Sequence, residues 1–318
     1  MRIALIPALL AAAATSAFCS DVELMNLVMS DAHVVAGINV QNARNTTFGR
    51  FVLDRMQADD KGLAKLAETT GFDPRRDLDE IMLASTADFT NKSAKGIALV
   101  RGRFDQSKIA AAVKAMGPTQ IERRGGFDIY TSKTGSSENG FVFLTPSLGA
   151  AGDLASVRET VDRKAAGKSM NAETAKRVQA LSAANDVWML STVQISSFAG
   201  PVPTAAAPGS AMHGFLSDGI FRSLDQAAMG FHFGAGSVEM NLQTVSKTEK
   251  DATALADVVR LVSNLVQMQR DNKDMAQLAA ALEAMQLSQQ AKNVTLKLAI
   301  PQSEIERMFD QGKSVKRI

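Results

Sequence analysis

The sequence predicts an α+β protein built from two related modules, each a mainly antiparallel sheet covered by helices. Two observations lead to this prediction. Short strand-like segments follow one another across tight turns, and such hairpins pair their strands antiparallel. In addition, 77–116 has the pattern strand, turn, strand and helix, and a degenerate copy of this pattern occupies 223–262. The pair Leu78-Asp79 of the first copy corresponds to Leu224-Asp225 of the second.

The first module is expected to span 21–168. Alternating apolar residues predict its strands, and apolar residues spaced three or four apart predict its helices. Asp105 and Asp153 are placed to cap the helices that follow them, and Gly125-Gly126 is typical of a hairpin turn. In chain order we expect a strand over 34–40, helices over 47–56 and 62–70, strands over 81–85 and 97–102, a helix over 106–116, a hairpin over 121–132, a turn over 136–140, strands over 141–145 and 148–152, and a helix over 153–167.

A linking helix is predicted in 169–185, and the second module is expected to occupy 186–318. Three prolines among Ala, Gly and Ser make 200–219 a long Pro/Ala/Gly loop. After it we expect strands over 227–233 and 238–245, a long helix, a second helix running to about residue 290, a strand over 294–300 and a last helix that ends at Gly312.

The long helix of the second module carries an apolar stripe at helical spacing. We expect Val259 and Val262, which lie in this stripe, to face the interior. Replacing Val259 by Asp would then place an unpaired charge in an apolar core and largely unfold the second module.

The first residues predict an export signal over 1–20. Arg2 is followed by an apolar run from Ile3 to Ala14 and then by small residues, and this run is shorter than a membrane-spanning helix. Cleavage would leave a secreted or periplasmic chain that starts between Phe18 and Asp21, without a transmembrane segment. The alternative is lipid anchoring at Cys19, although Phe18 occupies the position where a lipoprotein signal carries a small residue.

Charge and aromatic content exclude one class of partner. The 318-residue chain has a net charge of +2, and aromatic residues make up 5% of it. Such a chain has neither the field nor the stacking surface that nucleic-acid binding requires, so no nucleic-acid partner is expected. Arginines at 101, 103, 123 and 124 would form one positive patch if their strands pair, or ordinary ion pairs with neighbouring acids.

The tripeptide Gly-Lys-Ser occurs at 167–169 and again at 312–314. A phosphate-binding loop needs a glycine five residues before the Gly-Lys pair, on a turn from strand to helix. Asp162 and Arg307 stand at those positions, and each tripeptide follows a predicted helix. We therefore interpret both tripeptides as helix C-caps.

No catalytic, cofactor-binding or metal-binding residue is predicted. Ser210 and His213 are close in sequence, but they lie in the 200–219 loop without a carboxylate to orient the ring. The three histidines are isolated from one another, and His232 alternates with phenylalanines on a strand, so it should point off the sheet surface.

Three segments and the leader together resemble uncharacterised secreted bacterial proteins with a duplicated α+β module. The segments are FDPRRDLDEIMLAS at 72–85, KGIALVRGRFD at 95–105 and AGDLASVRETVDRK at 151–164. The resemblance concerns the layout of most of the chain. It implies bacterial export and a duplicated fold, and it assigns no site residue.

The sequence thus predicts a non-catalytic binding or structural protein of the cell envelope or extracellular space, with a protein or small molecule as its partner and without a cofactor. The alternative is a hydrolase-like enzyme in which the loop holding Ser210 and His213 becomes ordered over a cleft.

Overall fold

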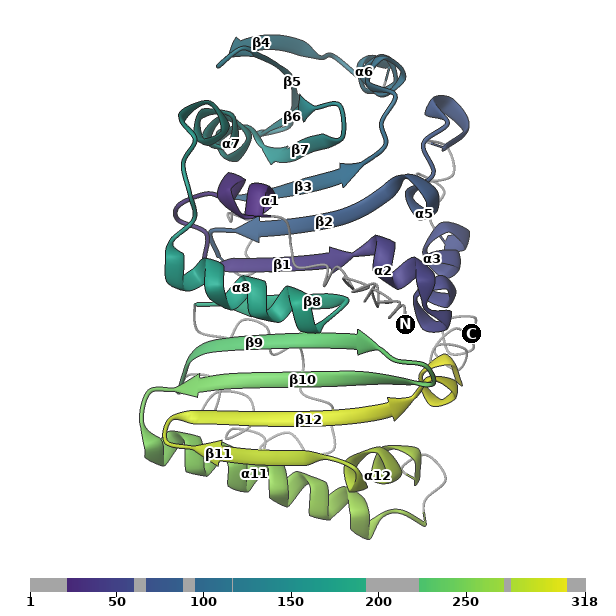
Figure 1. The fold of residues 1–318 in the computed structure, drawn as a ribbon, viewed down its shortest axis with the longest axis vertical. Helices are drawn as coiled ribbons and strands as arrows, with labels where there is room; N and C mark the ends of the chain where they lie inside the picture. The colour runs from purple at the N-terminus through teal and green to yellow at the C-terminus, as the bar shows by residue number, and fades with distance from the viewer. Residues whose placement is uncertain are drawn as a thin grey trace, which may run out of the picture.

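The computed structural model describes residues 22–59, 67–87, 95–115, 117–192, 223–271 and 276–307. Within these ranges all strands belong to one 12-stranded sheet, with the order β11-β12-β10-β9-β8-β1-β2-β3-β7-β6-β5-β4. Every neighbouring pair is antiparallel (Figure 1). The expected α+β class with antiparallel sheets is confirmed, and the two expected sheets form a single continuous one.

The first half of the chain supplies seven of these strands and most of the helices. Its strands are β1 Val34–Asn39, β2 Leu78–Ser85, β3 Gly96–Gly102, β4 Gln120–Arg124, β5 Phe127–Thr134, β6 Ser137–Thr145 and β7 Leu148–Asp153. Its helices are α1 Val22–Leu27, α2 Val40–Asn45, α3 Thr47–Asp59, α5 Pro74–Asp77, α6 Gln106–Ala115 and α7 Leu154–Ala166.

Helix α8, Ala172–Ala184, leads into the second half. The strands of that half are β8 Val187–Ser191, β9 Leu224–Phe233, β10 Ser237–Ser246, β11 Gln286–Gln290 and β12 Asn293–Pro301. Its helices are α11 Glu249–Met268 and α12 Ala276–Glu283, and residues 302–307 are also helical.

Both halves use the same strand order. The first runs β1-β2-β3-β7-β6 and the second β8-β9-β10-β12-β11, and the β4–β5 hairpin of the first half has no counterpart among the described strands of the second. The corresponding strands β1 and β8 pair antiparallel, with Ala36 opposite Met189, and this pairing joins the two halves. Such an arrangement agrees with the interpretation of the chain as an internal repeat.

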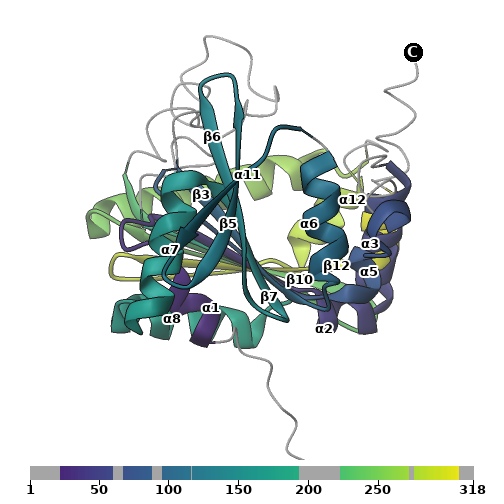
Figure 2. The same cartoon turned by 90° about the horizontal axis from the view of Figure 1, so that it is seen from above.

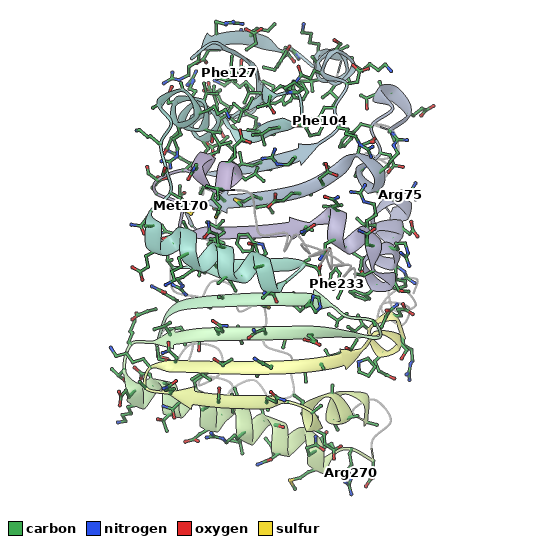
Figure 3. The ribbon with its side chains drawn as sticks, viewed as in Figure 1. Arg75, Phe104, Phe127, Met170, Phe233 and Arg270 are labelled. Atoms are coloured by element: carbon green, nitrogen blue, oxygen red, sulfur yellow. The ribbon has the colours of Figure 1, made fainter. Side chains whose placement is uncertain are left out.

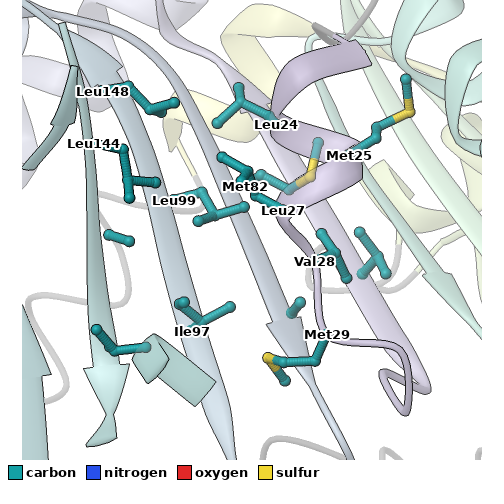
Figure 4. Packing of buried hydrophobic residues seen from close by; sticks show 14 of the residues in the cluster. Leu24, Met25, Leu27, Val28, Met29, Met82, Ile97, Leu99, Leu144 and Leu148 are labelled. Carbon is teal, nitrogen blue, oxygen red and sulfur yellow. The ribbon is translucent and has the colours of Figure 1, made fainter. Parts of the chain in front are cut away.

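The main core lies on one face of the first half of the sheet, and we call this side face A. Helix α1 inserts Leu24, Met25 and Leu27 against residues of the strands (Figure 4), and α7 and α8 pack on the same side. Helix α11 packs instead on the opposite side, face B, where Ala252 and Ala256 contact Val294. Figure 2 shows α1 and α8 on one side of the sheet and α11 on the other.

The predicted helix ends are found where local side chains or glycines hold them. The carboxylate of Asp153 accepts a hydrogen bond from the Ser156 amide at the start of α7. Gly167 ends α7 in the left-handed conformation, with φ of 59°, so the first Gly-Lys-Ser tripeptide is a C-cap as predicted. The second tripeptide lies outside the described residues.

Two predicted elements are wrong. The helix expected to reach about residue 290 ends at Glu283, and Gln286–Gln290 form the edge strand β11. The expected turn at 136–140 is mostly strand, because β6 begins at Ser137. Both segments are rich in polar residues, and such a composition is also typical of a helix surface or a turn. Pairing with a neighbouring strand decides that these segments form strands.

The apolar stripe of α11 does not face the interior throughout. Ala252 and Ala256 are fully buried and Val266 is buried, whereas Val259 is half-buried and Val262 is 36% exposed. The expectation that Val262 is buried is therefore wrong. Only one side of a helix packs against a sheet, and the other side stays exposed.

Several expectations fall outside the described residues. These are the leader at 1–20, Cys19, the loop at 200–219 with Ser210 and His213, and the end of the last helix at Gly312. Among the helices that the structure describes, none has the length and the apolar character needed to cross a membrane.

Candidate functional site

Face A changes abruptly from apolar to polar residues across the sheet. The change can be followed along one row of residues that lie opposite one another on successive strands. From the junction of the halves toward β5 the row contains Gly37, Met82, Leu99, Ala150, Val142 and Ile129, and its side chains are buried. In the other direction, beyond Trp188 and Gly230, it contains Asn241, Lys297 and Gln286. The row is thus apolar under the helices of the first half and polar in the second half.

Most of the remaining residues of face A on β9, β10, β12 and β11 are polar as well, with apolar exceptions such as Ala228 and Ala299. We call this surface the polar face; its residues are His232, Glu239, Asn241, Gln243, Thr295, Lys297, Gln286, Ser288 and Gln290. Within the described ranges no helix lies in front of these strands (Figure 3). Side chains that remain in contact with water gain nothing from being apolar, so the polar sequence of these strands fits an uncovered surface.

A groove lies where the polar face meets the end of α8. Its volume is about 400 Å³, and it is lined by Ala184, Asn185, His232, Glu239, Met240, Asn241, Ala284, Gln286, Lys297, Leu298 and Ala299. The side chain of Asn185 forms one wall and lies directly over Gly230, because a Cβ at that glycine would be 2.2 Å from the Asn185 amide. Glycine at 230 therefore lets the wall close onto the sheet.

Beneath the groove, the lining residue His232 contacts the buried side chain of Asp186. The side chain of Asp186 is 0% exposed, and one of its carboxylate oxygens lies 3.1 Å from Nδ1 of His232. The same oxygen accepts the Phe233 amide at 2.7 Å, and the other accepts Nδ2 of Asn42 at 2.7 Å. An ionised carboxylate only accepts hydrogen bonds, and beside it Nδ1 of His232 acts as the donor, which leaves Nε2 of this half-exposed side chain as the second polar atom of the ring.

Groups of both charge signs line the groove together with the imidazole. Glu239 lies directly opposite His232 on the neighbouring strand, and Lys297 lies opposite Asn241 one strand further. The Oδ1 atom of Asn241 is buried and has no hydrogen-bond partner among the residues that the structure describes. The groove therefore presents a cation, an anion, an imidazole and amides, which suits a small polar molecule with both donors and acceptors.

The groove lacks the parts of a nucleophilic active site. A histidine held by a buried carboxylate is the base half of a catalytic triad. No Ser, Thr or Cys is found among the described residues that line the groove. Across the described ranges there is also no group of three or more His, Cys, Asp or Glu that could hold a metal ion.

The contact between Asp186 and His232 was not predicted from the sequence. His232 itself was expected to point off the sheet, and it does so. The two residues are separated by 46 positions. Their contact depends on the pairing of β8 with β9, which places Val187 opposite Phe231. The only local signal is an aspartate immediately before a strand, which is also common at ordinary strand ends.

The four arginines that could have formed one positive patch are each engaged with an acid. Arg101 contacts Glu23, Arg103 contacts Asp77, Arg123 contacts Asp128 and Arg124 contacts Asp162. The Arg124 guanidinium lowers the pKa of the Asp162 carboxyl by hydrogen bonding. Of the two interpretations left open by the sequence, ordinary ion pairing is the one found.

Comparison with known proteins adds information about the fold alone. No protein-family model matches the chain, and no curated protein matches it. Among solved structures, crystal form IV of TP0453 has a TM-score of 0.50 at 9% identity, covering 90% of this chain and 95% of that one. Crystal forms I and III of TP0453 have TM-scores of 0.49 at 9% and 8% identity, covering 90% and 87% of this chain and 96% and 94% of theirs.

Proposed function

We propose that this chain is an exported, non-catalytic binding protein that holds a small polar molecule in the groove beside His232. The observation that supports the proposal most is the switch of face A from buried and apolar to open and polar within one continuous sheet. A structural protein has no need for a groove that collects Glu239, Lys297 and an oriented imidazole.

The buried carboxylate supports binding because it fixes the recognition group in advance. Asp186 holds His232 in one orientation and is itself held by Asn42 from the other half of the chain. A side chain that is already oriented loses little conformational entropy when a ligand binds.

The test is a titration of the purified chain with a panel of free amino acids and of mono- and disaccharides. Binding is monitored by ¹H–¹⁵N NMR. We expect saturable shifts in β9, β10 and β12 with at least one probe, and loss of these shifts in His232→Ala and in Glu239→Gln. Ser288→Ala, on the same face outside the groove, is the control and should bind normally. Absence of binding by every probe, or binding unchanged in both groove variants, would overturn the proposal.

Export is tested separately, on protein purified from its native host. We expect N-terminal sequencing to give a first residue between Phe18 and Asp21. Recovery of a chain that begins with Met1 would contradict export by cleavage of the leader, and a lipid-modified Cys19 would favour an anchored form.

A hydrolase-like enzyme is the second candidate, and the Asp186–His232 pair is the observation that favours it. A water molecule activated at Nε2 of His232 would replace the missing side-chain nucleophile. The chain should be screened with ester, peptide, phosphate and glycoside substrates, and any activity repeated in His232→Ala, Ser210→Ala and His213→Ala. Activity that one of these substitutions abolishes would replace the binding proposal with an enzymatic one.

A further inference from the structure

The two outer edges of the sheet differ in how well they are protected against pairing with another strand. An exposed edge offers unpaired N–H and C=O groups, and proteins usually block it with charged residues, proline or a bulge. Strand β4 forms one edge and carries three charged residues in its sequence QIERR. Strand β11 forms the other edge, and its sequence QLSQQ contains no charge and no proline.

The charges of β4 are also fixed in place. Glu122 pairs with Arg158 at 2.6 Å, Arg123 with Asp128 at 2.6 Å, and Arg124 with Asp162 at 2.7 Å. An incoming strand would have to displace these pairs. On β11 four of the five residues are exposed, and no such pair is found within the described part of that strand.

The first half of the chain shows what covers the corresponding edge. Strand β6 has the same place in the first half as β11 has in the second, next to β7 and β12 respectively. Its outer edge is covered by β5, which pairs with it antiparallel from Ile129 opposite Val142 to Thr134 opposite Ser137. The described residues of the second half contain no strand in the place of β5.

We propose that the outer edge of β11, which no described strand covers, binds an extended segment of a partner protein as an added antiparallel strand, in the position that β5 holds beside β6. Two residues, 291 and 292, connect β11 to β12, so Gln290 and Asn293 form a hydrogen-bonded pair across the turn. Because bonding alternates along an antiparallel strand, Leu287 and Gln289 then direct their backbone N–H and C=O groups away from β12. These groups are the attachment points of the added strand.

The side chains of β11 set the character of the partner segment. Gln286, Ser288 and Gln290 lie on the polar face, whereas Leu287 points to face B and packs against the core under α11. A matching strand therefore alternates polar residues on one side with apolar residues on the other, and about five residues are enough to span β11.

A second copy of the chain fits this edge less well than a single strand. Helix α11 runs along β11 and extends beyond its edge (Figure 1). Pairing β11 with β11 of another copy would bring two α11 helices into the same space, whereas a single strand requires a width of only about 5 Å.

The experiment uses a dye-labelled peptide with the sequence of β5, Phe127–Thr134, and the full chain in a fluorescence anisotropy titration. We expect saturable binding that weakens at least about tenfold in Gln289→Pro, because proline removes one outward N–H group and its hydrogen bond. Gln289→Ala is the matched control: it removes the same side chain, keeps the N–H group and should bind like the wild type. The unfolding midpoints of both variants should equal that of the wild type, which shows that β11 remains paired with β12.

Three results would overturn the proposal. The first is absence of binding by the wild-type chain, and the second is equal binding by Gln289→Pro and Gln289→Ala. The third is concentration-dependent dimerisation in light scattering that Gln289→Pro abolishes, because the edge would then belong to a second copy. A second measurement uses the wild-type chain and therefore does not depend on whether the variants fold. A peptide N-methylated at alternate residues should bind only when its methyl groups face away from β11.

Discussion

The indole ring of Trp188 lies directly over Gly37, its cross-strand partner at the junction of the two halves. A Cβ at Gly37 would be 2.4 Å from ring atoms of Trp188. The absence of a side chain at Gly37 therefore allows β1 and β8 to pair beneath a large buried ring. Replacing the glycine tests how strongly this junction holds the sheet together.

We expect Gly37→Ala to lower the free energy of unfolding by about 1–3 kcal/mol, since the Trp188 ring is buried and must shift. Urea denaturation followed by tryptophan fluorescence reports on it directly, because Trp188 is the only tryptophan in the chain. Gly236→Ala is the control, as a Cβ there meets no atom within 4 Å. Equal stability of the two variants would show that the junction adapts to a methyl group.

Replacing one acceptor oxygen of the buried Asp186 carboxylate by an NH₂ group should destabilise the fold. In Asp186→Asn an NH₂ group must face at least one of three donors, the Asn42 amide, the Phe233 amide or Nδ1 of His232. We expect a loss of about 1–3 kcal/mol in unfolding free energy. Asp225→Asn, at an exposed position on β9, should change little. Unchanged stability of Asp186→Asn would show that Asn42 or His232 reorients so that the site loses no hydrogen bond.

Helix α11 should tolerate a charge on one side and not on the other. Ala256→Asp places a carboxylate against Val294 in the core under the helix, and we expect it to cost several kcal/mol and to unfold much of the second half. Val262→Asp, at a residue that is 36% exposed, should leave the thermal midpoint almost unchanged. Equal effects of the two substitutions would show that another part of the chain or a partner covers Val262. Val259→Asp, at the half-buried position between them, should give an intermediate loss.

Acid should loosen the attachment of α1. Hydrogen bonds from Lys164 and then from Arg101 hold the pKa of Glu23 below its ordinary value of 4.5. Because the folded-state pKa is the lower one, this stabilisation is complete above about pH 4.5 and is lost as the pH falls through the folded pKa. We expect the free energy of unfolding of Glu23→Gln, measured by urea denaturation, to fall less steeply at acid pH than that of the wild type. Glu283→Gln, at an exposed position of α12, should leave the curve unchanged. Curves of the same shape for both variants and the wild type would contradict the role of Glu23.

What could be predicted from the sequence depends on how far apart the interacting residues are. Asp153 caps α7 and Gly167 ends it through bonds to residues at most four positions away, and both could be recognised from residue type and spacing. The strand nature of Gln286–Gln290 could not, because a polar segment of five residues carries no period, and its pairing with β12 decides the matter. The same holds for the candidate site, where Asp186 meets His232 only after β8 and β9 have paired in one register.

By itself the sequence determined the α+β class, the antiparallel pairing and the related strand order of the two halves, since hairpin turns, caps and apolar periodicity act over a few residues. Only the tertiary structure decided that the halves share one sheet through β1 and β8, and that Trp188 covers Gly37 there. It also decided which polar strands no described helix covers and which edge no described strand pairs with. These features rest on register and on the placement of helices across distant segments, where a shift of one residue would turn every side chain to the other face.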